Sequence, residues 1–278
     1  MFQTRLFVLP VIAVVLGACT PLEPAPTDLN ELLHFFLQHY SEGDDALIGE
    51  ASVNTINWFD EQLEGEETAG SVSVLSKDEV SALGLSADTD LSNLIGVFHF
   101  VEQQCSVTEL EELYFFEDQM ILFPDNYEDY ARTYGDSREC FADGSCNLVD
   151  WMLHINDSLL GQSMVYDLSS GLRRVVGQQD AQGNELSILL SRTWMPEPAI
   201  IGQGEGAAFF DQSYQIELFV SPVGQSTSLH LYGLWNSGGL DGLSSDPAFW
   251  ENQYLDGIVE WDERLDLLCA MKDPFNPE

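Results

Sequence analysis

Hydrophobic positions near the amino end of the chain recur at helical spacing. Leucine and phenylalanine side chains repeat at intervals of three and four residues between Asp28 and Tyr40, and Asp28 with Glu31 forms a start like a capping box. A similar stripe predicts a second helix from Asp45 to Leu63. Two shorter helices are predicted where a hydroxyl residue precedes glutamate by three positions. These starts are Ser76 with Glu79, for a helix ending near Gly84, and Thr108 with Glu111, for a helix ending near Phe116.

Beyond residue 118 the pattern changes to the alternation that is typical of strands. We predict strands over 119–123, 148–155, 163–168, 172–177, 185–194, 214–221, 226–235 and 256–261, after two earlier ones over 71–75 and 93–101. Turn-forming residues at 169–171 and 180–184 predict hairpins, and helical spacing returns over 261–271. Helices followed by antiparallel strands predict an α+β fold with a curved antiparallel sheet, a meander that tends toward a barrel.

Composition indicates a folded chain. Of the 278 residues 45% are hydrophobic and 11% aromatic, which excludes a disordered protein. We expect residues 28–272 to form one acidic domain, with a subdivision near 118–135 left open, followed by a short tail at 273–278. Residues 19–27 contain three prolines and predict a stiff tether.

The charge balance limits the choice of partners. The chain has 47 acidic and 9 basic residues, a formal net charge of −38 at pH 7. Such a chain repels phosphate backbones, so we expect that it does not bind nucleic acid. The favoured interpretation is an acidic surface that maintains solubility in a saline setting, and clusters of carboxylates that bind divalent cations are the alternative.

Four cysteines follow the first 19 residues, and an even number in an exported chain favours disulfides. Cys140 and Cys146 enclose a turn-forming stretch, which makes a local bridge the natural pairing. Cys105 would then pair with Cys269. The other two connectivities stay open, and a zinc site is disfavoured because the chain has no Cys-x-x-Cys pair.

The first 18 residues have the form of a cleaved secretory leader, with Arg5 before an apolar run that is too short to span a bilayer. The run ends in Leu16-Gly17-Ala18-Cys19, which resembles the lipobox of bacterial lipoproteins. The resemblance covers the leader only. It implies lipidation of Cys19 with fatty acyl chains such as palmitate. Because Thr20 and not aspartate follows Cys19, it also implies attachment to the outer membrane of a Gram-negative cell.

Candidate binding residues come from the predicted strands. Trp151, Trp194 and Trp235 alternate with polar positions, so core packing is the favoured interpretation and an aromatic-lined sheet cavity is the alternative. Arg174 and Arg192 are rare cations on strands, suited to hold a carboxylate if they face inward. Arg173 and Arg174 must face opposite sides of the sheet.

Metal chemistry has weak signals. Asp88, Asp90 and Ser92 have the spacing of the first ligands of a calcium loop, but Asn93 replaces its glycine and an ordinary turn is favoured. Three histidines on predicted strands, His99, His154 and His230, form a metal site only if they converge. Motifs for zinc peptidases, phosphate loops and serine hydrolases are absent from the sequence, and we expect neither a cofactor nor a catalytic site.

Two functions from different classes follow. The first is a lipid-anchored, non-catalytic envelope protein that binds a protein partner or forms part of the surface. The alternative is a carrier or sensor that encloses a small apolar ligand in an aromatic-lined sheet cavity. A hydrolase that uses paired carboxylates is a third hypothesis without specific residues to support it.

Overall fold

The computed structural model describes residues 24–41, 44–62, 68–85, 89–124, 127–159, 162–201, 208–240 and 246–275. The leader, Cys19 and Asp88 lie outside these residues. Within them, no helix has the length and hydropathy needed to span a membrane.

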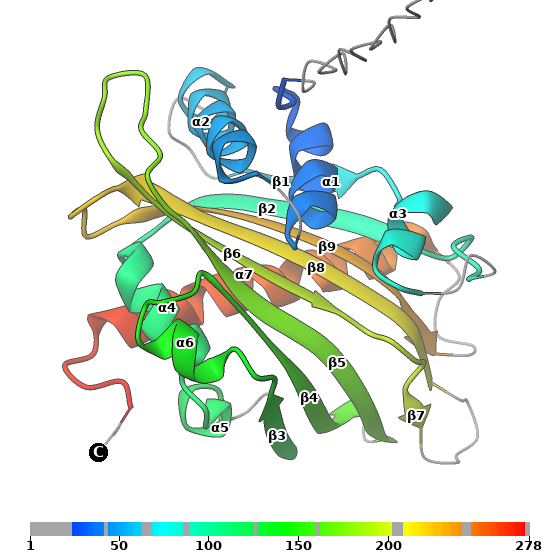
Figure 1. The fold of residues 1–278 in the computed structure, drawn as a ribbon. Helices are drawn as coiled ribbons and strands as arrows, with labels where there is room; N and C mark the ends of the chain where they lie inside the picture. The colour runs from blue at the N-terminus through cyan, green and yellow to red at the C-terminus, as the bar shows by residue number, and fades with distance from the viewer. Residues whose placement is uncertain are drawn as a thin grey trace, which may run out of the picture.

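The described residues form one nine-stranded, curved antiparallel sheet (Figure 1). Its order is β1-β2-β9-β8-β6-β5-β4-β3, with the short β7 paired to β5. The strands are β1 (Thr68–Val72), β2 (Ile95–Gln103), β3 (Asp129–Tyr134), β4 (Leu148–Leu159), β5 (Gln162–Val175), β6 (Leu186–Trp194), β7 (Ile200–Ile201), β8 (Ala208–Pro222) and β9 (Ser228–Leu240). Strands β4, β5, β6, β8 and β9 form the expected meander, whereas β3 and β7 are strands that the sequence analysis does not predict, and β2 joins the far side by pairing with β9. The sheet ends at β1 and β3 and does not close into a barrel.

Helices cover both faces of the sheet (Figure 1). One face carries α1 (Leu29–His39), α2 (Asp45–Gln62) and α3 (Lys77–Ala82), with the largest apolar cluster beneath them. The other face carries α4 (Val107–Phe115), α5 (Gln119–Leu122), α6 (Arg138–Ala142) and the long α7 (Pro247–Ala270). Because neighbouring strand residues point to opposite faces, each strand contributes to both layers.

Most of the predicted helices are confirmed. Helix α1 begins at the N-cap Asp28, whose carboxylate accepts the amide N–H of Asn30, and α3 has the predicted capping box of Ser76 and Glu79. The start predicted at Thr108 is wrong by two residues. The capping box of α4 is instead formed by Ser106 and Glu109.

The turn predicted at 169–171 is wrong, because β5 runs without interruption from Gln162 to Val175. Gly171 serves close packing rather than a turn. A Cβ atom there would lie 2.5 Å from the Val149 carbonyl oxygen and 2.6 Å from the Tyr40 hydroxyl, so glycine lets the end of α1 approach the sheet.

Two predicted strands are helices. Residues 119–123 contain α5, where Gln119 is buried and donates to the Leu113 and Phe116 carbonyls at the end of α4. Residues 256–261 belong to α7, which begins with Asp246 as N-cap and a proline in its first turn. The buried stripe of α7 includes Asp262, a charged residue that interrupts its hydrophobic period.

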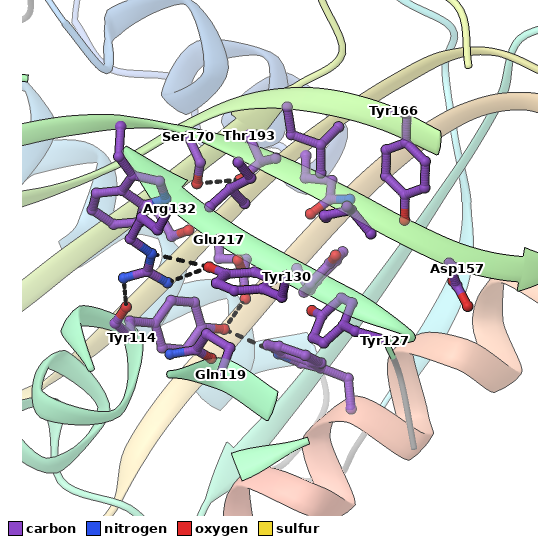
Figure 2. Close-up of a pocket in the computed structure, with 18 residues that line it drawn as sticks. Tyr114, Gln119, Tyr127, Tyr130, Arg132, Asp157, Tyr166, Ser170, Thr193 and Glu217 are labelled. Atoms are coloured by element: carbon purple, nitrogen blue, oxygen red, sulfur yellow. Dashed lines mark hydrogen bonds between the residues drawn. The ribbon is translucent and has the colours of Figure 1, made fainter. Parts of the chain in front are cut away.

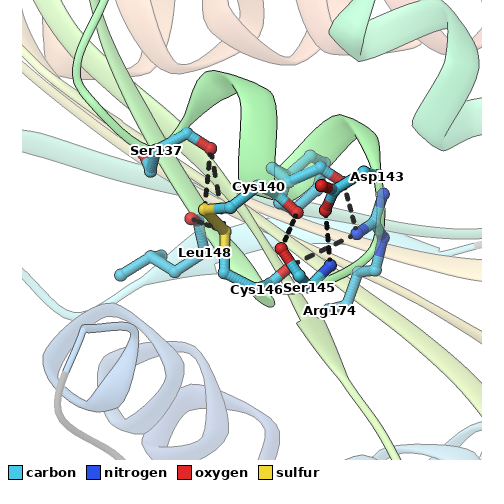
Figure 3. The surroundings of a disulfide bond; sticks show 8 residues. Ser137, Cys140, Asp143, Ser145, Cys146, Leu148 and Arg174 are labelled. Atoms are coloured by element: carbon cyan, nitrogen blue, oxygen red, sulfur yellow. Dashed lines mark hydrogen bonds between the residues drawn. A yellow bond between two sulfur atoms is a disulfide. The ribbon is translucent and has the colours of Figure 1, made fainter.

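Both disulfides of the preferred pairing are present. Cys140 and Cys146 close a short loop that joins α6 to the start of β4, with 5.2 Å between their Cα atoms (Figure 3). Cys105 and Cys269 join the segment between β2 and α4 to the end of α7. The second bridge therefore fixes α7 against the face of the sheet that also carries α4.

Candidate functional site

A cavity of about 280 Å³ lies between the sheet and the helices α4, α5 and α7 (Figure 2). Its wall combines aromatic rings with hydrogen-bonding groups and few aliphatic side chains. The lining residues are Tyr114, Gln119, Tyr127, Tyr130, Arg132, Trp151, Leu153, Ile155, Asp157, Tyr166, Leu168, Ser170, Ser191, Thr193, Gln215, Glu217, Tyr232 and Trp261.

Strand alternation supplies most of this wall. Alternate residues along part of β3, β4 and β5 line the cavity, and residues of β6, β8 and β9 continue the same face. In cross-strand pairs Trp151 lies opposite Ser170, and Ser170 lies opposite Thr193. The Ser170 and Thr193 hydroxyls are 2.7 Å apart and form a hydrogen bond.

Arg132 is the cation of the cavity. Its guanidinium lies 4.4 Å from the centre of the Trp151 ring and donates to the Tyr130 hydroxyl at 2.7 and 3.0 Å (Figure 2). It also donates to the Tyr134 hydroxyl and to the Tyr114 carbonyl. No carboxylate of the described residues lies within ion-pair distance of it. In a chain this acidic, that placement is unusual.

Glu217 is the buried anion of the cavity. Only 4% of its surface is exposed, and its Oε2 accepts a hydrogen bond from the Tyr114 hydroxyl (Figure 2). Trp261 Nε1 donates to the same hydroxyl at 3.0 Å. Burial, followed by the nearby Glu217 carboxylate, raises the pKa of Tyr114 well above its ordinary value, so Tyr114 stays a phenol.

A chain of buried ionisable groups runs behind Glu217. His230 Nε2 is 3.5 Å from Glu217 Oε2, and its Nδ1 donates to Asp262 Oδ1 at 2.7 Å. The other oxygen of Asp262 lies 2.5 Å from His99 Nδ1. Burial alone would lower the pKa of His230, but Asp262 and Glu217 outweigh it and raise that pKa to about 9. His230 is therefore an imidazolium at neutral pH.

The remaining hydroxyls of the wall stay protonated. Burial, as the largest cause, raises the pKa of Tyr127, Tyr166 and Tyr232 above the ordinary value. None of these three hydroxyls forms a hydrogen bond with another described residue. The cavity thus presents phenol donors, a fixed carboxylate and a fixed guanidinium beside flat ring faces. Such a combination of aromatic surface and a few oriented polar groups is typical of a binding site.

Of the five candidate binding residues, Trp151 lines this cavity. Trp194 and Trp235 point to the opposite face of the sheet, because they lie at the other phase of strand alternation. Trp235 is fully buried there, and its Nε1 donates to the Ser73 carbonyl at 2.8 Å. Trp194 packs against the same core.

The two candidate arginines have structural partners. Arg174 lies on the face that carries the cavity, but its guanidinium binds both oxygens of Glu111 at 2.6 Å and covers the Phe141 ring. Arg192 points to the opposite face, where it donates to the Leu37 carbonyl and the Ser41 hydroxyl at the end of α1. Arg173 and Arg174 do face opposite sides.

The metal candidates do not come together. Asp90 is exposed and its carboxylate accepts the Ser92 amide N–H, as in an ordinary turn. His99 and His230 converge on Asp262, whereas His154 is exposed and hydrogen-bonded to Asp167. Across the described ranges, no three histidine, cysteine, aspartate or glutamate side chains are arranged to hold a metal ion.

Sequence reasoning missed Arg132, Glu217 and the tyrosines of the wall. A signal for Arg132 existed, because Tyr130, Arg132 and Tyr134 alternate and predict one face of a strand. No comparable signal exists for Glu217. It is one acid among 47, and only the pairing of β8 with its neighbours brings it beside Tyr114 and His230.

Comparison with known proteins gives likeness to solved structures only. No protein-family model and no curated protein matches the chain. A START superfamily protein from Mycobacterium smegmatis is 16% identical, with a TM-score of 0.35 over 62% of this chain and 94% of that chain. The STAR-related lipid transfer protein of Xanthomonas axonopodis is 9% identical, with a TM-score of 0.39 over 66% and 97%. Ginseng major latex-like protein 151 is 10% identical, with a TM-score of 0.34 over 65% and 100%.

Proposed function

We propose that this protein is a carrier or sensor that holds a small ligand in the cavity between the sheet and α4, α5 and α7. The observation that carries the proposal is the wall itself, in which Glu217 and Arg132 are fixed by their neighbours while several tyrosine hydroxyls have no partner among the described residues. These hydroxyls face the cavity, so they are available to a molecule that enters it, and ligand pockets typically combine aromatic walls with a few polar groups that orient the ligand. The TM-scores above are low, and the proposal does not depend on those likenesses.

The sheet offers a matched pair of variants for testing the cavity. Ser170 and Ser169 are neighbours on β5, but Ser170 lines the cavity whereas Ser169 points to the opposite face, beside the exposed Met152. Ser170→Phe fills the cavity, and Ser169→Phe adds the same ring outside it. Circular dichroism checks that both variants fold. If Ser170→Phe does not fold, Ser191→Leu replaces it as a smaller substitution that also fills the cavity.

The measurement is mass spectrometry of small molecules extracted from the purified full-length chain. We expect a compound that is recovered with the wild type and with Ser169→Phe and is lost from a folded cavity-filling variant. Equal recovery from all three proteins, or none from the wild type, would reject the cavity as the binding site.

The second part of the proposal is that the protein is attached to the cell envelope. The lipobox-like end of the leader supports this part. Cells fed an alkyne-tagged palmitate should label the wild type, and Cys19→Ala should abolish the label because the thiol that receives the lipid is gone. Thr20→Asp should keep the label and move the protein to the inner membrane. Undiminished labelling of Cys19→Ala would refute lipidation at this residue.

A further inference from the structure

The wall of the cavity carries charges of both signs. The guanidinium of Arg132 comes from β3, whereas the carboxylates of Glu217 and Asp157 come from β8 and β4. A ligand with a net charge would be attracted by the groups of one sign and repelled by those of the other sign. In a partly buried site, that repulsion is weakly screened by solvent. A neutral ligand with both donors and acceptors avoids the repulsion.

The hydrogen-bonding groups of the wall that have no partner among the described residues favour a ligand that carries hydroxyl groups. Tyr114 occupies Oε2 of Glu217, and Oε1 forms no hydrogen bond with any other described residue. Tyr232, on the neighbouring β9, has an equally unused hydroxyl. A ligand hydroxyl donates and accepts at once, so it matches a wall that presents a carboxylate acceptor beside phenol donors.

The aromatic rings of the wall and the volume of the cavity limit the class of ligand further. The wall contains the side chains of two tryptophans and five tyrosines, which favour flat or ring-shaped molecules. The volume of about 280 Å³ lies just below the roughly 300–1,000 Å³ that is usual for ligand pockets. One ring therefore fits better than a long acyl chain or a fused ring system.

We infer that the ligand is a small neutral ring compound that carries several hydroxyl groups, either a monosaccharide-sized cyclic polyol or a polyhydroxylated aromatic ring. This inference rests on the proposed function, because it requires that the cavity binds a small molecule. Glu217 accepts a ligand hydroxyl through Oε1, and Tyr232 donates to a ligand oxygen. His230, held by Asp262, is a positioning residue that fixes the Glu217 carboxylate from behind.

The first test is a ligand panel measured by saturation-transfer NMR on the full-length chain in lipid nanodiscs. The panel contains glucose, galactose, myo-inositol and catechol as neutral hydroxylated rings. Glucuronate and glucosamine are the charged counterparts, and decanoate is the apolar chain. We expect binding of a neutral ring, and binding about tenfold weaker for a charged ring of the same shape.

The outcomes separate the inference from the proposed function. Binding of decanoate without any neutral ring would overturn the inference and leave a cavity carrier standing. Tighter binding of glucuronate or glucosamine than of glucose would also overturn it. If no compound binds and the purified chain also lacks a co-extracted molecule, the proposed function fails as well.

Variants test the role of Glu217 directly. Glu217→Gln keeps the shape of the side chain and removes its charge, so affinity for the bound neutral ring should fall about tenfold. Tyr232→Phe, which removes one hydroxyl only, should weaken binding severalfold and serves if Glu217→Gln does not fold. Glu111→Gln, at a carboxylate outside the cavity that pairs with Arg174, is the control and should leave affinity unchanged. Unchanged affinity in folded Glu217→Gln or Tyr232→Phe would contradict the assignment.

Discussion

Several arginines in this chain donate hydrogen bonds to backbone carbonyl groups at the ends of helices. Arg173 donates to the Tyr40 carbonyl at 2.6 Å and Arg192 donates to the Leu37 carbonyl, so two guanidinium groups satisfy the carboxyl end of α1. Arg264 of α7 binds the carbonyl of Leu122 and connects that helix to α5. Arg132 alone among these four lines the cavity.

The pKa of His230 makes a prediction about pH. An unfolded histidine has a pKa of about 6.5, whereas the folded chain raises the pKa of His230 to about 9. Its contribution to stability is therefore fully present below about pH 6.5 and is lost as pH rises through about 9. We expect the melting temperature to fall across this window.

His230→Gln should flatten that part of the melting profile, because the titrating group is gone. His154→Gln changes an exposed histidine on β4 and should keep the slope of the wild type. Thermal melts followed by circular dichroism at several pH values provide the measurement. A wild-type profile that is level or rising between pH 6.5 and 9, or an unaltered slope in His230→Gln, would contradict the account of this network.

At the scale of elements, glycine has opposite roles in β5 and α7. A Cβ at Gly171 would collide with backbone and with Tyr40, whereas a Cβ at Gly257 would meet no atom within 4 Å. Gly171→Ala should lower the free energy of unfolding by about 1–3 kcal/mol through overpacking. Gly257→Ala should raise it by up to about 1 kcal/mol, because alanine favours the helix. Urea denaturation of the two variants measures both, and a change of the same sign in both would be incompatible with these packing arguments.

The same elements show how far the sequence predicts the fold. Helix α1 was predictable because its apolar stripe and its N-cap agree. Strand β5 was divided in two because Ser169-Ser170-Gly171 favours a turn locally, while tertiary packing of α1 requires the glycine inside a strand. The helical spacing predicted over 261–271 belongs to α7, but the earlier part of that helix was missed because residues 256–261 alternate like a strand, and within the helix Asp262 binds two histidines. Local patterns thus failed where a residue serves a distant partner.

The cavity could be predicted less completely than the fold. Trp151 was found because an aromatic residue in an alternating strand is a visible signal. Glu217, His230 and Asp262 come from β8, β9 and α7, and their meeting depends on sheet order and on the docking of a helix. Periodicity along the chain carries no information about such convergence.

At the scale of the whole molecule, the dominant property is the net charge of −38. Repulsion among surface carboxylates opposes the compact state, and salt screens it. We expect the melting temperature to rise from low salt to about 1 M NaCl, where the Debye length is about 3 Å. Sodium chloride and potassium chloride should act alike, since screening does not depend on a specific cation. A melting temperature independent of salt would show that self-repulsion does not limit stability.

The central claim, a cavity that holds a small ligand, is tested most directly by native mass spectrometry of the full-length chain released from detergent micelles. The account predicts one reproducible extra mass per chain, of the size of a single-ring compound, that is absent from a folded cavity-filling variant. A bare mass for the wild type, measured under conditions that preserve the fold and both disulfides, would contradict it.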